Sequence, residues 1–388
     1  MASMFPAVLI GGPPKSGKSQ LSLRLHQALL RRGVSHYLLR ANPDGEGNWF
    51  YGSQPALAAE LRANAKVLWP NTVAGYADKL ARDIERRHLP LLVDLGGVVS
   101  DENHKLAAQC SHAIVIAADP GDLPAWRGLA ESHGLVQLAE LRSDLRGAQT
   151  ITDNGATLRG VISGLDPDLT PEGVCFEALV ERVAAVFNYA PEELERAHMA
   201  QTAVDLPLNL ERAIPPLPAH LEAVQPWDPS ELPVLLENLP EGESLGLYGR
   251  APAWLYSALA AFAFPQAVEL FDPRLGWVTP PQLAEGDQPD PRLTWEATND
   301  VDMVQLTFKL PGRYLERSEA DGLPVPPVAG RGVILDGPLP NWLAAALARH
   351  YRRSAAWIAH YRPQLHGCVV IWSPSGAPAV GTLIRSLL

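Results

Sequence analysis

The feature that most constrains the fold is a glycine-rich loop near the start of the chain. Residues 12–19 read Gly-Pro-Pro-Lys-Ser-Gly-Lys-Ser and fit the pattern G-x-x-x-x-G-K-[ST]. An apolar run at 7–11 precedes the loop, and leucines recur every four residues in the segment 18–32 that follows it. A loop between a buried strand and a helix directs main-chain N–H groups at a phosphate. The sequence therefore predicts a phosphate-binding α/β domain.

Three side chains would complete a site for ATP and Mg²⁺. In this pattern Lys18 reaches the β and γ phosphates, and the hydroxyl of Ser19 binds the cation. Asp94 ends an apolar strand and is either a second Mg²⁺ ligand or a residue that caps a turn. Leu95 follows where fast ATPases place a glutamate, so the sequence predicts ATP binding and leaves hydrolysis open. The residues predicted to contact ATP and Mg²⁺ are Gly12, Pro13, Pro14, Lys15, Ser16, Gly17, Lys18, Ser19 and Asp94.

Two further loops carry charged residues for which the sequence allows two interpretations. Asp44 and Glu46 lie in Asn-Pro-Asp-Gly-Glu, where either one is a base or a ligand to a metal-bound water, or both are simply turn residues. Arg142 and Arg146 are either arginine fingers that act on a neighbouring subunit or part of an ordinary surface helix end.

Predicted strands and helices alternate through the first half of the chain, to about residue 187. They lie at 7–11, 18–32, 36–40, 74–87, 89–95 and 113–118. This alternation is typical of a doubly wound parallel sheet. The Pro-rich stretch 206–219 interrupts it, and we place a domain boundary near residue 200.

The second half of the chain contains an internal repeat with an offset of 88 residues. Residues 247–262 align with 335–350, and both copies carry Gly-x-x-Pro-x-Trp-Leu. Each copy is predicted to run strand, turn, helix, strand, turn and strand. We therefore expect two tandem α+β units; a duplication that serves stability alone is the alternative. The predicted domains are 1–200, 201–310 and 311–388.

Charge is distributed unevenly along the chain. Lys and Arg number 32 against 43 Asp and Glu, a formal net charge of −11, which argues against a protein that coats duplex DNA. Residues 349–366, however, contain four arginines and no Asp or Glu, with aromatic residues between them. Such a segment suits a phosphate backbone with stacked bases. A solvated helix face beside core aromatics is the alternative.

Cysteine usage and hydropathy indicate a cellular compartment. The three cysteines are far apart and form no C-x-x-C pair, which suits a reducing environment. The N-terminus has no basic segment before its apolar run, so no signal peptide is predicted. No apolar stretch approaches the ~18 residues of a membrane span. We expect a cytoplasmic protein with no membrane partner.

The whole chain resembles a ring nuclease of type III CRISPR systems, in the form fused to an N-terminal AAA-type P-loop domain. The resemblance rests on the loop at 11–19, the segments 39–47 and 141–147, the two Gly-x-x-Pro-x-Trp-Leu units, and Phe-Asp-Pro-Arg-Leu-Gly at 271–276. It implies a P-loop NTPase followed by two tandem ring-nuclease-like units. It also implies binding and cleavage of cyclic tetra-adenylate, a second messenger, and Mn²⁺-dependent cleavage.

The resemblance implies that His350, Asp272 and Arg274 are the catalytic residues. The family motif has a histidine late in the helix and Asp-x-Arg in the following loop. The first unit has Asp272 and Arg274 but no histidine; the second has His350, with Arg362 and Gln364 in place of the loop pair. Either one composite site uses all three residues, or cleavage is lost and binding remains.

The expected partners are cyclic tetra-adenylate, ATP and further copies of the chain, and P-loop domains of this kind often form homo-oligomers around nucleotide. Two other functions stay open from the sequence. One is a small-molecule or nucleotide kinase with a regulatory C-terminal module, because a P-loop without a following glutamate is also kinase-like. The other is a non-catalytic sensor that sequesters the messenger.

Overall fold

A computed structural model describes residues 5–41, 75–166, 173–211, 227–312 and 314–387. Their contacts divide the chain into two compact bodies. The N-terminal body comprises the described residues up to Ala197 together with Pro273–Leu275. The C-terminal body comprises those from His198 onward without these three. The division into three domains stays a prediction.

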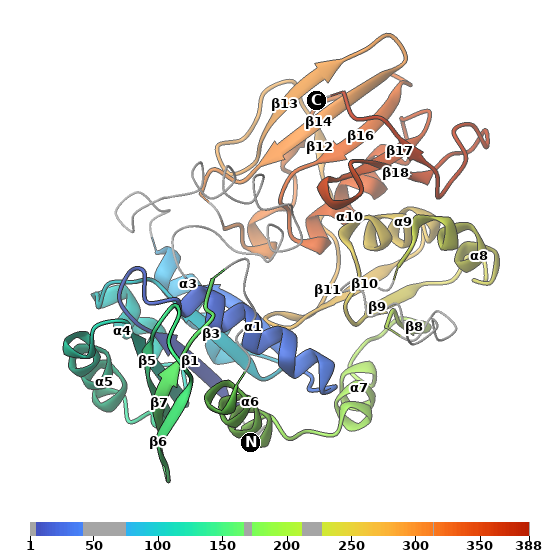
Figure 1. The fold of residues 1–388 in the computed structure, drawn as a ribbon. Helices are drawn as coiled ribbons and strands as arrows, with labels where there is room; N and C mark the ends of the chain where they lie inside the picture. Colours follow the sequence, from blue (N-terminus) through green and yellow to red (C-terminus); the bar gives the residue numbers. More distant parts are fainter. Residues whose placement is uncertain (1–4, 42–74, 167–172, 212–226, 313, 388) are drawn as a thin grey trace. The chain divides into compact units, whose positions relative to one another are not determined.

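The N-terminal body is built on a seven-stranded sheet of order β2-β3-β1-β4-β5-β7-β6 (Figure 1). All neighbouring strands run parallel except the β6–β7 pair. The strands are β1 (Ala7–Gly11), β2 (Tyr37–Ala41), β3 (Leu91–Leu95), β4 (His112–Ala117), β5 (Val136–Ser143), β6 (Thr150–Asn154) and β7 (Leu158–Ile162). The helices are α1 (Lys18–Arg31), α3 (Tyr76–Arg86), α4 (Asp101–Ala107), α5 (Leu123–Ser132), α6 (Val174–Val186) and α7 (Pro191–Met199), whose last residues fall in the C-terminal body.

Apolar patterning explains this sheet. The central strands β1 and β3 are buried along their whole length, as parallel strands covered on both faces must be. The leucines that recur every four residues in α1, such as Leu21 and Leu25, pack into the same core as Val8 and Ile10. The mixed α/β class with a parallel sheet is confirmed, and each element predicted from the sequence lies within about two residues of its observed bounds.

The first repeat of the C-terminal body is a four-stranded sheet of order β11-β10-β9-β8 with one helix. Its elements are β8 (Leu206–Asn209), β9 (Leu245–Tyr248), α9 (Ala253–Phe262), β10 (Val268–Asp272) and β11 (Gly276–Val278). β8, β9 and β10 run parallel, and β11 pairs antiparallel with β10. The sequence predicts no strand in the Pro-rich stretch 206–219, whereas Leu206–Asn209 form β8 of this sheet. Pro207 is tolerated there because β8 is an edge strand.

The second repeat contains the same strand order inside a six-stranded sheet, β13-β14-β16-β17-β18-β19. β14, β16 and β17 run parallel, and β18 is antiparallel to β17, so these four strands match β8, β9, β10 and β11. The elements are β13 (Thr294–Asn299), β14 (Met303–Lys309), β16 (Gly332–Asp336), α10 (Asn341–Tyr351), β17 (Ile358–Arg362), β18 (Gly367–Trp372) and β19 (Leu383–Ile384). The element order predicted from the repeat is thus present twice.

Short elements join and flank the two repeats. They are α8 (Leu232–Glu237) and a small parallel pair of strands, β12 (Ala284–Glu285) and β15 (Pro324–Val325). In the part of the chain that the structure describes, no helix combines the length and the apolar character needed to cross a bilayer.

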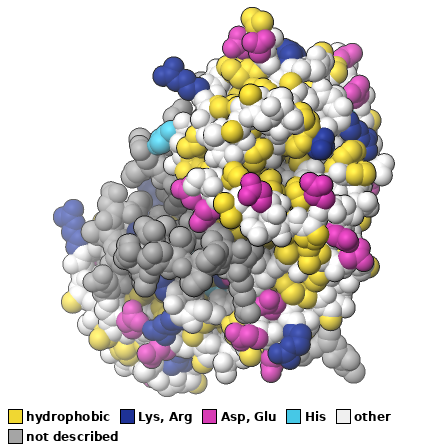
Figure 2. Space-filling model, turned by 90° about the vertical axis from the view of Figure 1, so that its right-hand side faces the viewer, with side chains coloured by type: hydrophobic (Ala, Val, Ile, Leu, Met, Phe, Trp, Pro, Cys, Tyr) yellow, Lys and Arg dark blue, Asp and Glu magenta, His cyan; other side chains and the backbone are white. Residues whose placement is uncertain are grey.

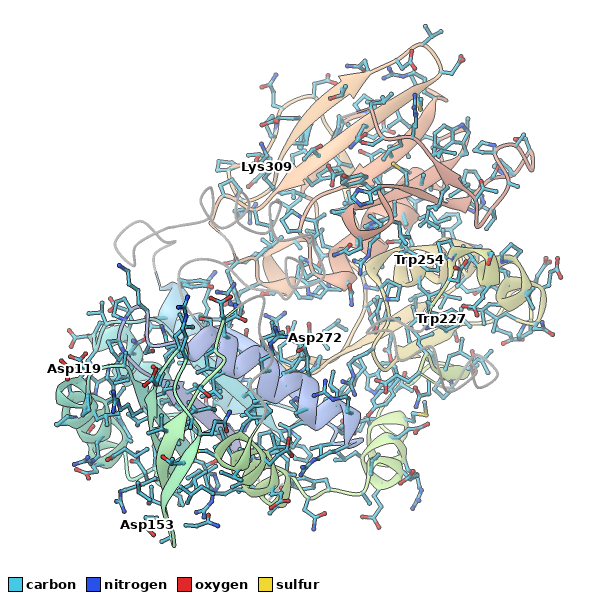
Figure 3. The ribbon with its side chains drawn as sticks, in the orientation of Figure 1. Asp119, Asp153, Trp227, Trp254, Asp272 and Lys309 are labelled. Carbon is cyan, nitrogen blue, oxygen red and sulfur yellow. The ribbon has the colours of Figure 1, made fainter. Side chains whose placement is uncertain are left out.

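The repeated sequence motif has a structural cause in the turn before each helix. Gly249 and Gly337 both have positive φ, 94° and 127°, which side chains disfavour. A Cβ on Gly337 would lie 2.2 Å from the main-chain oxygen of Phe308. The tryptophan five residues after each glycine is buried: Trp254 in α9 is 1% exposed and Trp342 in α10 is 2% exposed (Trp254 is labelled in Figure 3). α9 and α10 pack against each other, which pairs the two repeats within one chain.

Candidate functional site

The glycine-rich loop joins β1 to α1 in a conformation that demands particular residues. Lys15 and Gly17 have positive φ, 64° and 82°. A Cβ on Gly12 would lie 2.0 Å from the main-chain oxygen of Ile116, so only glycine fits there. Loops in which left-handed residues alternate with others turn successive N–H groups toward one side and form anion-binding concavities. The loop is therefore suited to hold a phosphate group.

Asp94 lies beside this loop because β3 is the neighbour of β1. Its Cα pairs with that of Ile10, two residues before the loop, and its side chain is fully buried. Burial raises the pKa of Asp94, and the charges of Arg40 and Lys18 and the nearby hydroxyl of Ser19 partly offset that rise. Nε of Arg40 lies 3.8 Å from Oδ2 of Asp94. The structure thus brings Lys18, Ser19 and Asp94 together, as the motif predicts.

Several oxygen atoms at this place lack donors. Both carboxylate oxygens of Asp94 and the hydroxyl of Ser16 are buried and make no hydrogen bond of normal geometry with the described residues. The hydroxyl of Ser22, which is also near Asp94, donates instead to the main-chain oxygen of Lys18 at 2.8 Å. Buried oxygen atoms without a partner are rare. A hydrated Mg²⁺ would supply the missing donors, so these residues fit the cation that the sequence predicts.

The structure describes only one of the two other charged loops that the sequence singled out in the N-terminal half of the chain. Asp44 and Glu46 lie outside the described residues. Arg142 is in β5, so the alternative of a surface helix end is wrong; its guanidinium lies 3.9 Å from Asp144. The main-chain N–H of Arg146 donates to Oδ1 of Asp144 at 3.3 Å, which shapes the turn after β5. Their role as arginine fingers stays a prediction.

Three arginines of the acid-free window have intramolecular partners. Arg349 donates to the main-chain oxygens of Ala260, Pro265 and Gln266 at 3.2, 3.3 and 2.8 Å. It therefore caps the C-terminal end of α9. Arg353 lies over the ring of Phe264, 5.2 Å from its centroid, and Arg352 lies 4.2 Å from the ring centroid of Trp372.

The remaining members of the window lie on β17 and after it. His360 is buried, and desolvation lowers its pKa to about 4. Arg362, the last residue of β17, is half-buried. The arginines of 349–366 thus serve different local contacts. On the face drawn in Figure 2, basic side chains are interspersed with acidic and hydrophobic ones.

The three predicted catalytic residues have different neighbours. His350 lies near the end of α10. Its ring N–H donates to the main chain of Leu283, and the carboxylate of Glu285 is nearby. Asp272, at the end of β10 (labelled in Figure 3), lies near the hydroxyl of Tyr256, and its charge contributes to the raised pKa of that tyrosine. Arg274 is buried and lies 3.7 Å from the carboxylate of Asp83. Among the described residues, His350 makes no hydrogen bond or ion pair with Asp272.

Burial affects His350 in a way that matters for acid–base chemistry. Desolvation lowers the pKa of His350 below its usual value, while the Leu283 hydrogen bond and Glu285 oppose this shift. The imidazole is therefore neutral at neutral pH. A neutral imidazole can accept a proton, which is the property that a general base requires.

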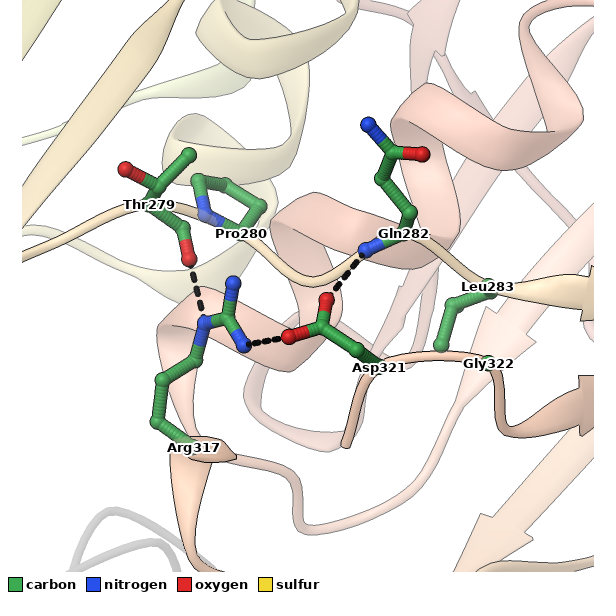
Figure 4. A pocket seen from close by; sticks show the side chains of 7 residues that line it. All are labelled: Thr279, Pro280, Gln282, Leu283, Arg317, Asp321 and Gly322. Atoms are coloured by element: carbon green, nitrogen blue, oxygen red, sulfur yellow. Dashed lines mark hydrogen bonds and ion pairs between the residues drawn. The ribbon is translucent and has the colours of Figure 1, made fainter. Parts of the chain in front are cut away.

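A pocket lies beside the segment that holds His350. Its lining residues are Thr279, Pro280, Gln282, Leu283, Arg317, Asp321 and Gly322, and its volume is about 530 Å³ (Figure 4). Arg317 donates to the main-chain oxygen of Thr279 and to Oδ2 of Asp321, the latter at 2.8 Å. Oδ1 of Asp321 accepts from the main-chain N–H of Gln282 at 2.9 Å. These polar groups hold one another and so shape the pocket wall.

Sequence reasoning missed a buried carboxylate, Asp336, at the end of β16. Desolvation raises its pKa, and its Oδ2 accepts from the hydroxyl of Thr307 at 3.0 Å. The amide of Gln305 lies 3.4 Å from the same oxygen, and its own Oε1 accepts from Ser386 at 2.8 Å. A signal was present: Gln305 and Thr307 alternate with apolar residues, which places two polar groups on one face of β14.

Comparison with known families places one part of this chain. Residues 309–385, about a fifth of the chain, match the model of the CRISPR-associated protein family Cas_csx3. The matched segment runs from the end of β14 past β19 and so covers most of the second repeat. The C-terminal part of the protein is therefore a CRISPR-associated domain. A comparison of the chain with curated proteins found no match.

Proposed function

We propose that the protein is an ATP-binding ring nuclease. In this proposal it binds and cleaves cyclic tetra-adenylate, switches off type III CRISPR signalling, and assembles into a homo-oligomer under the control of bound nucleotide. The proposed architecture is a P-loop NTPase domain followed by two tandem ring-nuclease-like units. This assignment is finer than the family match, which identifies only a CRISPR-associated domain at residues 309–385.

One observation carries the proposal. The repeat that matches a CRISPR-associated family has a second copy of its strand order in the same body, and the helices of the two copies pack against each other. A cyclic tetranucleotide has approximate rotational symmetry. Two related units, placed side by side, can present similar surfaces to two sides of such a ring. The duplication therefore supports a cyclic ligand better than a linear one.

His350 is the proposed general base. In the reaction, the ribose 2′-oxygen attacks the adjacent phosphorus and gives its proton to the imidazole, while the bond from phosphorus to the 5′-oxygen breaks; the 5′-oxygen leaves as a hydroxyl with a proton from water, and a 2′,3′-cyclic phosphate remains. The main-chain contact with Leu283 orients the ring, and its lowered pKa keeps it unprotonated before the attack. Asp272 is proposed to orient a partner group. The catalytic role of Arg274, which groups with the N-terminal body, stays a prediction of the sequence.

ATP and Mg²⁺ are assigned to the N-terminal body. The loop 12–17 would hold the phosphates through its main chain, Lys18 would contact the terminal phosphates, and Ser19 and Asp94 would hold Mg²⁺. The buried oxygens of Asp94 without donors support this assignment. Bound nucleotide is proposed to control assembly of the oligomer.

The expected Mn²⁺ finds less support. Within the described ranges, no group of three or more His, Cys, Asp and Glu side chains is placed to hold a metal ion. We therefore derive no step of cleavage through Mn²⁺, and we assign the proton transfer to His350 alone.

The test is direct. Pure protein is incubated with labelled cyclic tetra-adenylate, with and without ATP, and with His350→Ala and Asp272→Ala. His366→Ala is the matched control, because His366 is an exposed histidine in the same window. We expect linear di-adenylate products from the wild type and the control, and none from His350→Ala. Tight binding without products would identify a sensor that sequesters the messenger, and a phosphorylated acceptor without binding would identify a kinase. Either result would overturn the proposal.

The Lys18→Ala variant tests separately whether bound ATP controls oligomerisation. Mass photometry of the wild type with and without ATP reports the oligomeric state. We expect ATP to shift the wild type to a larger assembly and to leave Lys18→Ala unchanged. An assembly that does not respond to ATP in the wild type would contradict the proposed control by nucleotide.

A further inference from the structure

A pocket in the C-terminal body has a wall that two chain segments hold in place (Figure 4). Residues 279–283 follow β11, and residues 317–322 precede β15. The main-chain N–H of Gly322 donates to the main-chain oxygen of Gln282 at 2.7 Å, and β12 pairs with β15 immediately beyond these segments. Backbone contacts thus fix the shape of the pocket before a ligand binds.

The guanidinium of Arg317 is a fixed planar part of this wall. Its Nε donates to the main-chain oxygen of Thr279 and its Nη1 to Oδ2 of Asp321, so two hydrogen bonds hold the plane (Figure 4). The side chain of Arg317 still has 22% of its surface exposed. Nucleic-acid bases stack on guanidinium planes, and the neighbouring Pro280 and Leu283 supply apolar contacts.

The charges of the pocket lining cancel. Among the described residues that line it, Arg317 and Asp321 alone are charged. The hydrogen bond from Arg317 holds the pKa of Asp321 below its usual value, so the pair carries one charge of each sign at neutral pH. An anion such as phosphate would meet the carboxylate, and a cation would meet the guanidinium. The pocket is therefore suited to an uncharged planar group.

Two polar side chains of the lining are available to contact such a group. The hydroxyl of Thr279 and the amide of Gln282 make no hydrogen bond with any described residue. A glutamine amide combines an acceptor with donors, which is the pattern that pairs with the N6 amino group and N7 of adenine. The volume of about 530 Å³ lies within the roughly 300–1,000 Å³ of small-molecule sites, which leaves room for a nucleoside.

The pocket also adjoins the proposed general base, because Leu283 lines the pocket and its main chain accepts the ring N–H of His350. We propose that this pocket binds an adenine base, which stacks on the guanidinium of Arg317 and is recognised by the amide of Gln282. The inference rests on the proposed function only for the carrier of the base, which would be cyclic tetra-adenylate. A free adenine nucleotide presents the same base.

The test measures the Kd of AMP, IMP and CMP by saturation-transfer NMR on the full-length chain in a Lys18→Ala background, which weakens phosphate binding at the glycine-rich loop. We expect AMP to bind roughly tenfold more tightly than IMP, which has an oxygen in place of the amino group. Gln282→Leu should remove that difference by weakening AMP roughly tenfold. Arg317→Met should weaken all three ligands by a similar factor, because the stacking plane is lost. Gln288→Leu, which changes an exposed glutamine outside the lining, should leave each Kd unchanged.

Equal affinity for AMP and IMP, AMP binding that Gln282→Leu leaves unchanged, or binding of none of the three ligands would overturn the inference. Binding of cyclic tetra-adenylate to His350→Ala, with and without Gln282→Leu, identifies the carrier of the base. Ring binding that weakens roughly tenfold with Gln282→Leu assigns the base to the messenger. Unchanged ring binding beside Gln282-dependent AMP binding assigns it to a free nucleotide. Neither measurement depends on cleavage, so a failure of the proposed cleavage is distinguishable from a failure of this inference.

Discussion

The two repeats of the C-terminal body share a fold and differ in the residues at the ends of their elements. Both keep the glycine turn, the buried tryptophan and the strand order. The end of β10 is Asp272, whereas the end of β17 is Arg362, and the helix position of His350 in the second repeat is Phe262 in the first. Packing residues therefore preserve the duplicated fold, while the ends of strands and helices are free to diverge in chemistry.

The glycine turns give the largest expected effect. In Gly337→Ala the new Cβ would meet the main-chain oxygen of Phe308 at 2.2 Å, and φ of 127° adds strain. We expect a loss of ~4 kcal/mol in the free energy of unfolding. In Gly249→Ala the nearest atom is a side-chain oxygen of Asn209, 2.9 Å away, which can move, so we expect about half that loss. Chemical denaturation measures both.

Equal losses in these two variants would contradict the comparison. The two turns would then be strained alike, and the tighter packing of the second turn would have no energetic consequence.

A buried histidine gives the second repeat a pH dependence that the first lacks. His360 has a pKa of about 4 in the folded state and an ordinary value of 6.5, whereas the matching residue of the first repeat is Leu270. Because the unfolded chain takes up the proton first, stability is full above pH 6.5 and falls as the pH drops toward 4. The expected loss is ~3 kcal/mol.

His360→Leu, which copies the first repeat, should flatten this dependence. Urea unfolding at a series of pH values measures it, with His366→Leu as the control because His366 is exposed. A pH dependence that persists unchanged in His360→Leu would show that another group is responsible.

The cap between the two helices gives the smallest effect. Arg349→Gln removes a charged donor from three main-chain oxygens at the end of α9, and we expect a loss of ~2 kcal/mol. Arg353→Gln removes only a ring contact from an exposed side chain, and we expect a loss within about 0.5 kcal/mol. A thermal unfolding series compares the two, and a larger loss in Arg353→Gln would contradict the capping role of Arg349.

The sequence predicts the local parts of this structure better than the distant ones. The glycine-rich loop, the strand that ends at Asp94 and the two repeats follow from short-range patterns, because turn geometry and apolar spacing act within a few residues. The strand at Leu206–Asn209 was missed, because its pairing with β9 joins residues about forty positions apart and outweighs the local effect of Pro207.

For the candidate site, too, the sequence predicts local features better than contacts between distant segments. Lys18, Ser19 and Asp94 lie close together because strand order brings β3 beside β1, and their role in holding ATP and Mg²⁺ stays a prediction. The sequence could not show that Arg349 caps another helix or that Pro273–Leu275 group with the N-terminal body, since both depend on contacts between distant segments.

The proposed role of His350 is tested by the rate at which His350→Phe, which gives the second repeat the residue of the first, cleaves cyclic tetra-adenylate. We expect a loss of roughly 10²–10⁴-fold relative to the wild type, as for removal of a general base, with ligand binding retained. A variant that cleaves at the wild-type rate, or a wild type that neither binds nor cleaves the ring, would contradict it.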